Sequence, residues 1–363
     1  MSGNELTLSS VVPKLANSTT ATALVTTYDC VNQTLANGES CTDSVLLTGI
    51  SEGTNTLNFW AYTFNGTVGS KASVDMNFNI GNKFIYIANS TDASISRCPV
   101  NSTTGVMTAC TVIRDETFIA PFGITFNAAG TLAYVTNYPT QSGVNMKTGV
   151  FSACTPFTDN SFQWPASIVF NSAGTMAFIP SVLGDTISRC SVNPTTGALS
   201  ACTAYTSTDL DYALSYPFNI AFNAAHTKAF ITNLDHHVAI CSFNSDTDVI
   251  SACTTHSDDS FNTPSAMTLN ASTTRACPVD PSSGEFSDCT DFTDPSIDSP
   301  FGLTFNSAGT VAFVTSLYND SDTTQATGTT ISTCPFNTTT GKFSACNAFS
   351  DPTFSNPAGI ALL

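Results

Sequence analysis

Thirteen cysteines are the residues with the most evident chemistry in this sequence, and most of them occur at one fixed spacing. Paired cysteines bind zinc or form disulfides. Zinc sites favour Cys-x2-4-Cys knuckles, whereas the pairs here are twelve positions apart and only four histidines could complete a site. The spacing therefore favours disulfides, and the pairs are Cys98/Cys110, Cys190/Cys202, Cys241/Cys253, Cys277/Cys289 and Cys334/Cys346.

Short turn sequences such as NPTTG connect the paired cysteines and indicate β-hairpins. If Cys190 and Cys202 are directly opposed, we expect a three-residue loop, Thr195-Thr196-Gly197, with glycine at its left-handed position. Directly opposed Cβ atoms lie within disulfide reach. Because disulfides persist in oxidising compartments, the sequence predicts an extracellular or cell-surface protein.

Cys154 does not fit the pairing, because Ser142 stands twelve positions before it. We predict that Cys154 is a free thiol, either buried and inert or available for an intermolecular bond. Near the N-terminus, Cys30 and Cys41 flank the segment VNQTLANGES and are predicted to form a separate bridge.

Aspartate recurs at a second fixed position, three residues before a Phe or Ile, in the segments that follow the hairpins. Recurrence at one register favours a structural role in which the carboxylate caps a turn. The alternative is an acidic loop face that collects cations, although no EF-hand Ca²⁺ loop is present. We predict no catalytic residue, cofactor or resident metal, with Ca²⁺ binding as the alternative; the aspartates are Asp115, Asp159, Asp258, Asp294 and Asp351.

Composition narrows the range of partners. Lys plus Arg total 10 and Asp plus Glu 27, and the resulting net charge of −17 disfavours nucleic acid and anionic membranes. No apolar run is long enough for a transmembrane helix. The N-terminal MSGNELTLSS lacks a signal-peptide pattern, so we expect either a processed chain or an unusual export route. Other protein subunits or surface glycans are the expected partners.

The cysteine hairpins belong to a longer repeat. One copy, PFGITFNAAGTLAYVTN, runs from Pro121 to Asn137, and others begin at Pro165, Pro217 and Pro300. Each copy contains two apolar strands, and the hairpin adds two more. Four antiparallel strands per repeat are typical of a β-propeller blade.

The segments AYVTN (133–137), FITN (230–233) and FVTS (313–316) resemble the YVTN-type repeats of bacterial surface and lactonase-like β-propeller proteins. The resemblance covers about residues 79–363. Counting the repeats gives a six-bladed propeller in 81–363, in which the second and fifth blades are short. The fifth lacks a second strand, either because the blade is degenerate or because the sequence omits a segment.

Propeller closure is also predicted from the repeat. PAGIALL (357–363) has the pattern of a first strand, and KFIYIAN (83–89) that of a second strand with no first strand before it. We therefore expect the C-terminal strand to complete the first blade and so remove exposed sheet edges.

Residues 1–80 lack the repeat and contain alternating segments such as TLNFWAYTF. Strands of this kind separated by turns predict a small Ig-like β-sandwich. LANGESCTDSVLL resembles bacterial Ig-like modules, which implies a spacer or an assembly contact.

Together these features predict an all-β, exported, non-enzymatic surface protein that serves adhesion, scaffolding or assembly, as a homo-oligomer or as the repeating subunit of an extracellular filament or sheath. One alternative is a lactonase-like hydrolase, for which the resemblance implies carboxylates, His and Arg gathered over the propeller channel. Another is a Ca²⁺- or ligand-binding propeller.

Overall fold

A computed structural model divides the chain into two compact units, Met1–Asn82 and Lys83–Leu363. The described residues are six strands of the first unit and, in the second, 83–137 without 102, 142–147, 154–257, 264–267, 292–297 without 293, 300–316 and 330–363. The predictions for Cys30, Cys41, Asp258, Cys277 and Cys289 lie outside these residues. No helix in this described part is long and apolar enough to cross a membrane.

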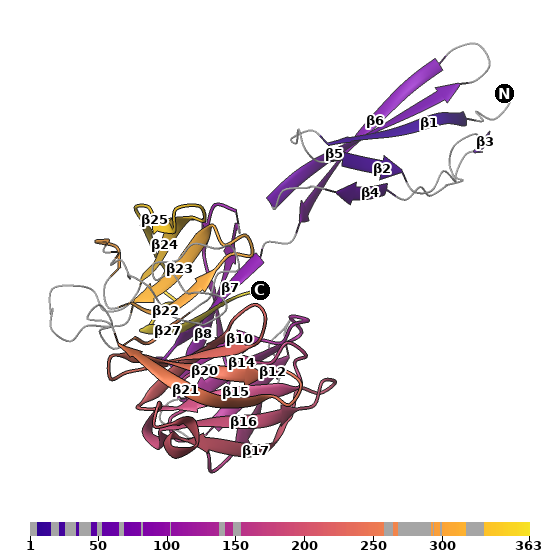
Figure 1. The fold of residues 1–363 in the computed structure, drawn as a ribbon. Coiled ribbons are helices and arrows are strands. Elements are labelled where there is room, and N and C mark those ends of the chain that lie inside the picture. The colour runs from indigo at the N-terminus through magenta and orange to yellow at the C-terminus, as the bar shows by residue number, and fades with distance from the viewer. Residues whose placement is uncertain are drawn as a thin grey trace. The chain divides into compact units, whose positions relative to one another are not determined.

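The first unit contains two antiparallel sheets (Figure 1). One has the order β3-β1-β5-β6 and the other pairs β2 with β4. Its alternating segments form the strands, because period-two patterns suit a sheet that presents two different faces. The strands are β1 (Leu6–Leu15), β2 (Thr22–Val25), β3 (Thr34–Leu35), β4 (Val45–Thr48), β5 (Gly53–Phe64) and β6 (Gly69–Ile80).

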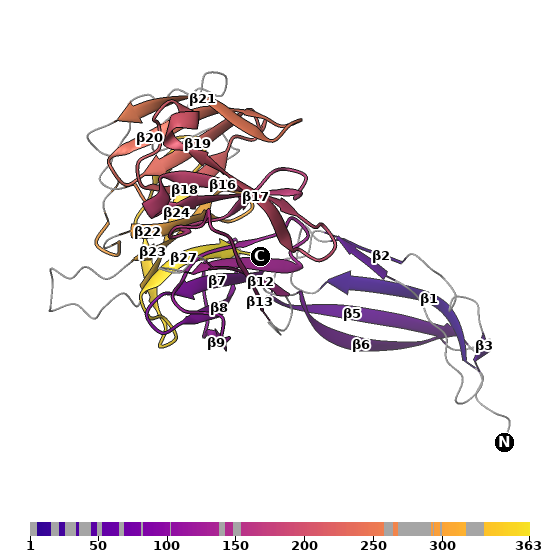
Figure 2. The same ribbon diagram turned by 90° about the horizontal axis from the view of Figure 1, so that it is seen from below.

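The second unit has a β-propeller arrangement of antiparallel sheets whose strands pair in sequence order, as in propeller blades (Figure 2). Three four-stranded blades are continuous in sequence. They are β10–β13 (Pro121–Phe126, Leu132–Asn137, Ser142–Lys147, Thr155–Thr158), β14–β17 (Val169–Phe170, Met176–Ser181, Thr186–Val192, Leu199–Thr206) and β18–β21 (Pro217–Phe222, Lys228–Asn233, His237–Asn244, Val249–Ser257).

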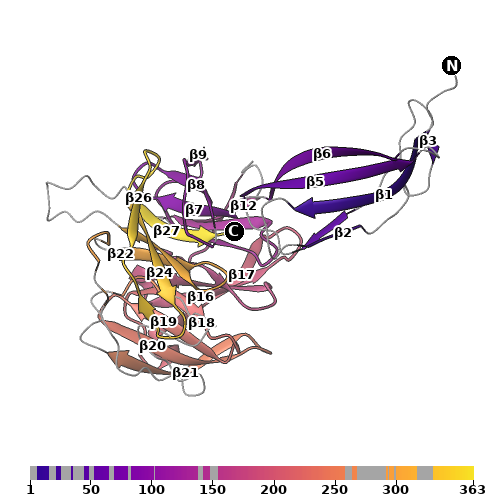
Figure 3. The same cartoon turned by 90° about the horizontal axis from the view of Figure 1, so that it is seen from above.

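A fourth four-stranded blade joins the two ends of the propeller, as predicted (Figure 3). The C-terminal strand β27 (Pro357–Leu362) pairs with β7 (Lys83–Asn89), which is followed by β8 (Ser94–Val100) and β9 (Thr111–Arg114). Phe84 and Leu363 also exchange backbone hydrogen bonds in both directions. The remaining sheet contains β22 (Pro300–Phe305), β23 (Val311–Ser316), β24 (Thr330–Asn337), β25 (Lys342–Phe343) and β26 (Asn347–Ser350).

The second strand of each blade forms most of the core, because both of its faces pack against neighbours. All six residues of β11 and all six of β23 are buried. Leu132 and Tyr134 of β11 share one apolar cluster with Ile179 and Cys190 of the next blade. This two-sided burial explains why segments such as AYVTN are apolar without alternation.

Four of the predicted disulfides are present, each joining the two outer strands of a blade: Cys98–Cys110, Cys190–Cys202, Cys241–Cys253 and Cys334–Cys346. The predicted hairpin loop was wrong. Val192 pairs with Leu199, and Asn193 with Ala198, which leaves a four-residue loop rather than Thr195-Thr196-Gly197.

A β-bulge takes up the odd residue that the prediction had assigned to the loop. Arg189 pairs with Thr203 and Ser191 with Ser200, so two residues, Ala201 and Cys202, face the single residue Cys190. Ala201 has a φ of +48° at this bulge. The loop itself is fixed by Asn193, whose side chain accepts the N–H groups of Thr195 and Thr196 at 2.9 Å each. Gly197 does take the left-handed position that was expected, with φ of +74°.

The position assigned opposite Cys154 was also wrong. Ser142 pairs with Thr158, and Asn145 pairs with Thr155, as Arg189 pairs with Thr203 in the next blade. Asn145 is therefore equivalent to Arg189, and the next residue, Met146, is equivalent to Cys190. Met146, not Ser142, is the residue whose position corresponds to the disulfide partner of Cys202. The hairpin of this blade is shorter, so counting twelve positions back overshoots the partner strand. Cys154 itself is a free cysteine.

Candidate functional site

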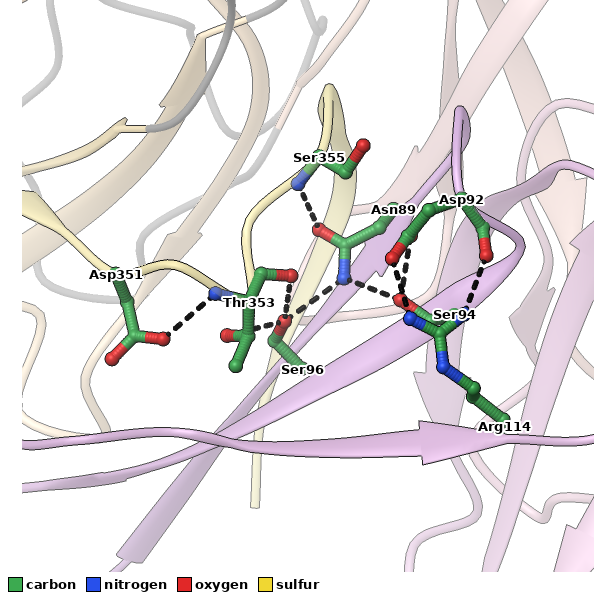
Figure 4. Close-up of polar contacts among 8 residues, drawn as sticks. All are labelled: Asn89, Asp92, Ser94, Ser96, Arg114, Asp351, Thr353 and Ser355. Carbon is green, nitrogen blue, oxygen red and sulfur yellow. Dashed lines mark hydrogen bonds and ion pairs between the residues drawn. The ribbon is translucent and has the colours of Figure 1, made fainter.

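Three of the recurring aspartates, Asp115, Asp294 and Asp351, attach an interblade loop to the blade that follows it. At the junction where the propeller closes, one Asp351 oxygen accepts the N–H of Thr353 at 3.0 Å (Figure 4). The other oxygen accepts the N–H of Cys110, in the outer hairpin of the next blade, at 3.1 Å. The carboxylate therefore holds its own turn and fastens that turn to the neighbouring blade.

The same contacts recur at other blade junctions. Asp115 accepts N–H groups from Thr117 and Cys154, and Asp294 accepts them from Ser296 and Cys346. Asp159 caps its turn through Ser161.

Asp211 was missed by the sequence analysis. Its carboxylate accepts the N–H of Cys253 at 3.1 Å. The loop that contains it includes a 3-10 turn, Ser207–Leu210, so the fixed spacing to a Phe or Ile is lost.

Hydrogen bonding lowers the pKa of two of these carboxylates, Asp351 and Asp294. Burial raises the pKa of Asp351, but hydrogen bonds from Thr353 and Cys110 outweigh it and leave the pKa below its ordinary value. Hydrogen bonds from Cys346 and Ser296 lower the pKa of Asp294. Among the described residues, no group of three or more His, Cys, Asp or Glu side chains could hold a metal ion.

Asparagines at the ends of the second strands complete the attachment of the loops. Asn89 donates to Ser94 and Ser96, at 3.1 and 2.9 Å, and accepts the N–H of Ser355 from the other end of the chain (Figure 4). Asn137 and Asn233 likewise accept N–H groups from the loops in front of their blades. The final Asn of segments such as AYVTN is therefore structural here.

The central channel contains a cavity of about 330 Å³. Six segments line it, each at the start of a repeat: 122–125, 166–169, 218–222, 265–267, 301–303 and 358–360. They approach closely, since a Cβ added at Gly123 would lie 2.5 Å from the carbonyl oxygen of Ala166 in the next segment. Within the described part of the chain, none of the residues that line the cavity is Asp, Glu, His, Lys or Arg.

Three phenylalanines meet at the end of the channel near the interblade loops. The rings of Phe122, Phe218 and Phe301 contact one another edge to face, with centroids 4.9 to 5.6 Å apart. Val182 and Leu234, which directly follow second strands, pack in the same cluster. Small residues occupy the alternate positions, so the channel end is filled by one apolar cluster.

The sequence contained a signal for this cluster. After the repeat proline, the residues are Phe122, Ala166, Phe218, Ser265, Phe301 and Ala358. This alternation of large and small residues becomes meaningful only when the six prolines are known to surround one axis.

Large apolar and aromatic side chains lie on the loops of the β14–β17 and β18–β21 blades. We define the aromatic loop patch as Trp164, Leu183, Tyr212 and Tyr216. Tyr212 is 77% exposed, and Leu183 and Tyr216 are each 49% exposed. Trp164 is half-buried against the phenylalanine cluster.

Two backbone hydrogen bonds and one to a carboxylate join the loops that carry Trp164, Leu183 and Tyr216. Val182 donates to the carbonyl of Trp164 at 3.1 Å, and Leu183 donates to that of Gln163 at 3.2 Å. The Asp185 carboxylate, from the same loop as Leu183, accepts the N–H of Tyr216 at 2.7 Å. The sequence analysis missed these residues, because nothing in their spacing marks them as neighbours.

No protein-family model matches the chain, and no curated protein matches it. Among solved structures, a chain of a nidogen/laminin complex is similar, with a TM-score of 0.54 and 15% identity, over 77% of this chain and 98% of that one. A putative 6-phosphogluconolactonase from Bacteroides fragilis matches over 99% and 98%, with a TM-score of 0.42 and 12% identity. A periplasmic gluconolactonase from Pseudomonas aeruginosa covers 85% and 80%, at 0.41 and 10%. At these identities the likeness concerns the fold alone.

Proposed function

We propose that this protein is an exported, non-enzymatic β-propeller that serves adhesion or assembly at the cell surface, with other protein subunits or surface glycans as partners and without a cofactor. The observation that carries the proposal is the channel. Its described lining contains no titratable side chain, and three phenylalanines fill its loop end. Hydrolysis of a lactone needs a general base or a metal-activated water. The described lining of the channel offers no side chain that could act as the base and no carboxylate or histidine that could bind the metal.

Two further features support this proposal. The loop carboxylates, which were candidates for a cation-binding face, are engaged in backbone hydrogen bonds that hold the blades together. Four disulfides suit an oxidising compartment, as an exported protein requires.

The finer architecture is part of the proposal. We infer six blades in 81–363, because six equivalent segments line one cavity. We also infer an Ig-like role for the first unit as a spacer or assembly contact, since it pairs a four-stranded antiparallel sheet with a two-stranded one.

The proposal predicts no turnover and measurable association. The purified protein should hydrolyse neither gluconolactone nor 6-phosphogluconolactone above the uncatalysed rate. It should form higher-order particles in sedimentation experiments, or bind cells in a pull-down assay. Saturable lactone turnover would overturn the proposal, as would a protein that stays monomeric and binds no cells.

A further inference from the structure

A second cavity, a groove of about 280 Å³, lies beside the β22–β26 sheet, and we call it the side groove. The segment 264–266, at the start of the fifth repeat, lines one side of it. Most of its lining residues are apolar, and among the described ones none is charged. On the side of the sheet and its preceding loop they include Phe292, Ile297, Leu303, Val314, Cys334 and Phe343.

The β14–β17 blade shows what covers this face elsewhere in the propeller. Leu132 and Tyr134, from the second strand of the preceding blade, pack in one cluster with Ile179 and Cys190. The Tyr134 hydroxyl also donates to the carbonyl of Gly197, in the outer hairpin, at 3.1 Å. In three other clusters, second-strand residues of one blade likewise pack with second-strand residues of the next.

The side groove lies at the corresponding place on the β22–β26 sheet. Val314 and Cys334, which line it, correspond in strand register to Ile179 and Cys190. The other described members of their cluster come from the same sheet, its hairpin or the loop before it. The groove is therefore the space that side chains of a preceding second strand fill elsewhere.

The residues around the side groove are less buried than their equivalents in other blades. Pro300 is exposed, whereas the prolines that begin β10, β18 and β27 are buried. Ile297 is half-buried, whereas the phenylalanines at its position are at most 5% exposed: Phe118, Phe162 and Phe354. Leu303 is half-buried, whereas the isoleucines at its position are at most 8% exposed: Ile124, Ile168, Ile220 and Ile360. A contiguous apolar surface left open in this way is typical of an interaction site.

The fifth repeat does not supply a second strand from its own sequence. Seven positions separate Asn270 from Cys277, whereas nineteen separate Asn171 from Cys190 in the third repeat. The second strands of the other repeats, such as β11 and β23, are six residues long. The difference of twelve positions removes this strand together with the loop that follows it.

The first segment of the fifth repeat is nevertheless held in position. The Ser265 hydroxyl donates to the carbonyl of Phe301 at 3.2 Å, and Met267 packs against the β18–β21 blade. In five other repeats the first proline pairs with the last residue of a second strand. The described residues 264–267 belong to no strand or bridge. Their position suits them to pair with a strand that comes from outside the repeat.

We propose that the side groove accepts an extended β-strand from a partner protein, which completes the fifth blade by strand addition. Backbone hydrogen bonds to residues 264–267 would supply affinity, and side chains in the groove would supply specificity. This inference rests on the proposed blade count and on the proposed role in assembly, and it names the kind of contact that a protein partner makes.

The strands that hold this position in other repeats define the chemistry of the partner strand. They are LAYVTN, MAFIPS, KAFITN and VAFVTS. The donated strand is therefore about six residues long and has alanine second, an aromatic residue third and no acidic residue. Its first and third side chains enter the groove, as Leu132 and Tyr134 face the next blade. An acidic strand is excluded, because a buried unpaired carboxylate is costly and the chain carries −17.

The test is binding of a synthetic strand to the full chain. A fluorescein-labelled peptide GTLAYVTN, residues 130–137 of this sequence, would be titrated with the protein and followed by anisotropy. Saturable binding is expected. A matched peptide with Leu132→Ser and Tyr134→Ser lacks both groove side chains and should bind about tenfold more weakly or worse, as when a buried aromatic anchor is removed. Bound GTLAYVTN should also raise the melting temperature of the protein.

Protein variants locate the binding site. Phe343→Asp places a charge in the side groove, and Phe292→Asp does so at a side chain that is already 36% exposed. Each should weaken binding of GTLAYVTN by about tenfold. Val106→Asp is the matched control, because it adds the same charge at a 61% exposed position on the hairpin of another blade. Melting temperatures without peptide identify any variant that fails to fold, and Phe292→Asp decides the test if Phe343→Asp does.

Three results would overturn the inference. They are the absence of saturable binding of GTLAYVTN, equal binding of the two peptides, and binding that the folded groove variants retain at the level of Val106→Asp. If the peptide fails while the protein still assembles or binds cells, only this inference is lost. If the protein turns over lactones, the proposed function falls independently of the peptide result.

Discussion

Cys154 shows how one residue of the repeat changes its chemistry when its partner is lost. Burial, followed by the neighbouring Asp115 carboxylate, raises the pKa of the thiol from its ordinary 9.0 to about 12. Thiolate is the reactive form of cysteine. We therefore expect iodoacetamide at pH 8 to label Cys154 slowly in the folded protein and rapidly in guanidinium chloride. Fast labelling of the folded protein would contradict the burial and the pKa shift.

The same shift predicts a dependence of stability on alkaline pH. Between about pH 9 and 12 the unfolded thiol loses its proton while the folded one retains it. Stability contributed by the neutral thiol is therefore complete below pH 9 and falls as the pH rises through this window. Urea unfolding from pH 8 to 10.5 should show a steeper loss for the wild type than for Cys154→Ser. If the unfolding free energies of the wild type and Cys154→Ser fell in parallel with pH, Cys154 would not be the group responsible.

Asp351 tests whether the recurring carboxylates are structural. Its side chain accepts backbone N–H groups from Thr353 and Cys110, which lose their partner in Asp351→Ala. Leaving such groups unpaired costs about 1–3 kcal/mol each where they are buried, so we expect a loss of about 2 kcal/mol in urea unfolding. The control is Asp246→Ala, which alters an exposed carboxylate on a hairpin loop. Equal effects of the two variants would argue against the structural role.

Acid should weaken the same contacts. The pKa values of Asp115, Asp294 and Asp351 are lowered in the fold, so their stabilisation is present above the ordinary value of 3.8. This stabilisation is lost as the pH falls below about 3.8 and passes through the lowered pKa values of the folded state, because protonation removes the charged acceptor. Unfolding free energies measured from pH 5 to 2 should fall less steeply for Asp351→Asn than for the wild type. An equally steep fall would show that Asp351 does not titrate with folding.

At the scale of elements, the hairpins show what residue spacing can and cannot predict. The cysteine spacing predicted four disulfides correctly, because a repeated separation implies repeated geometry. It could not predict the bulge opposite Cys190, since a bulge and a longer loop add the same number of residues. The Asn193 side chain accepts the N–H groups of two loop residues and thereby favours the four-residue loop over the three-residue one.

The register in the β10–β13 blade can be tested by engineering. Met146 occupies the position that corresponds to Cys190, so Met146→Cys should form a disulfide with Cys154. Ser142→Cys is the matched control, because Ser142 pairs with Thr158 and should leave both thiols free. Non-reducing peptide mapping distinguishes the two variants. A 142–154 crosslink would restore the register that simple counting had suggested.

At the scale of the whole molecule, the sequence predicted the order of the strands and the closure by β27. It predicted neither the phenylalanine cluster nor the aromatic loop patch. Phe122, Phe218 and Phe301 are far apart in the sequence and meet only because their segments surround one channel. Trp164 and Tyr216 have positive φ values, as Asn356 does at the same position before a repeat proline, and residue type would have argued against this conformation for the two aromatic residues.

Closure of the propeller gives the last prediction. β27 contributes Ile360 to a core cluster shared with Ile85, Phe313 and Ile331, and it supplies the ladder that covers the edge of β7. Ile360→Ala removes only side-chain packing and should cost about 2–5 kcal/mol. Deleting 357–363 removes the packing and the ladder together and exposes a strand edge. The deletion should therefore lower the thermal midpoint well beyond Ile360→Ala and increase aggregation, both measurable by calorimetry and light scattering. A deletion no worse than the point variant would mean that β27 covers the blade without closing the ring.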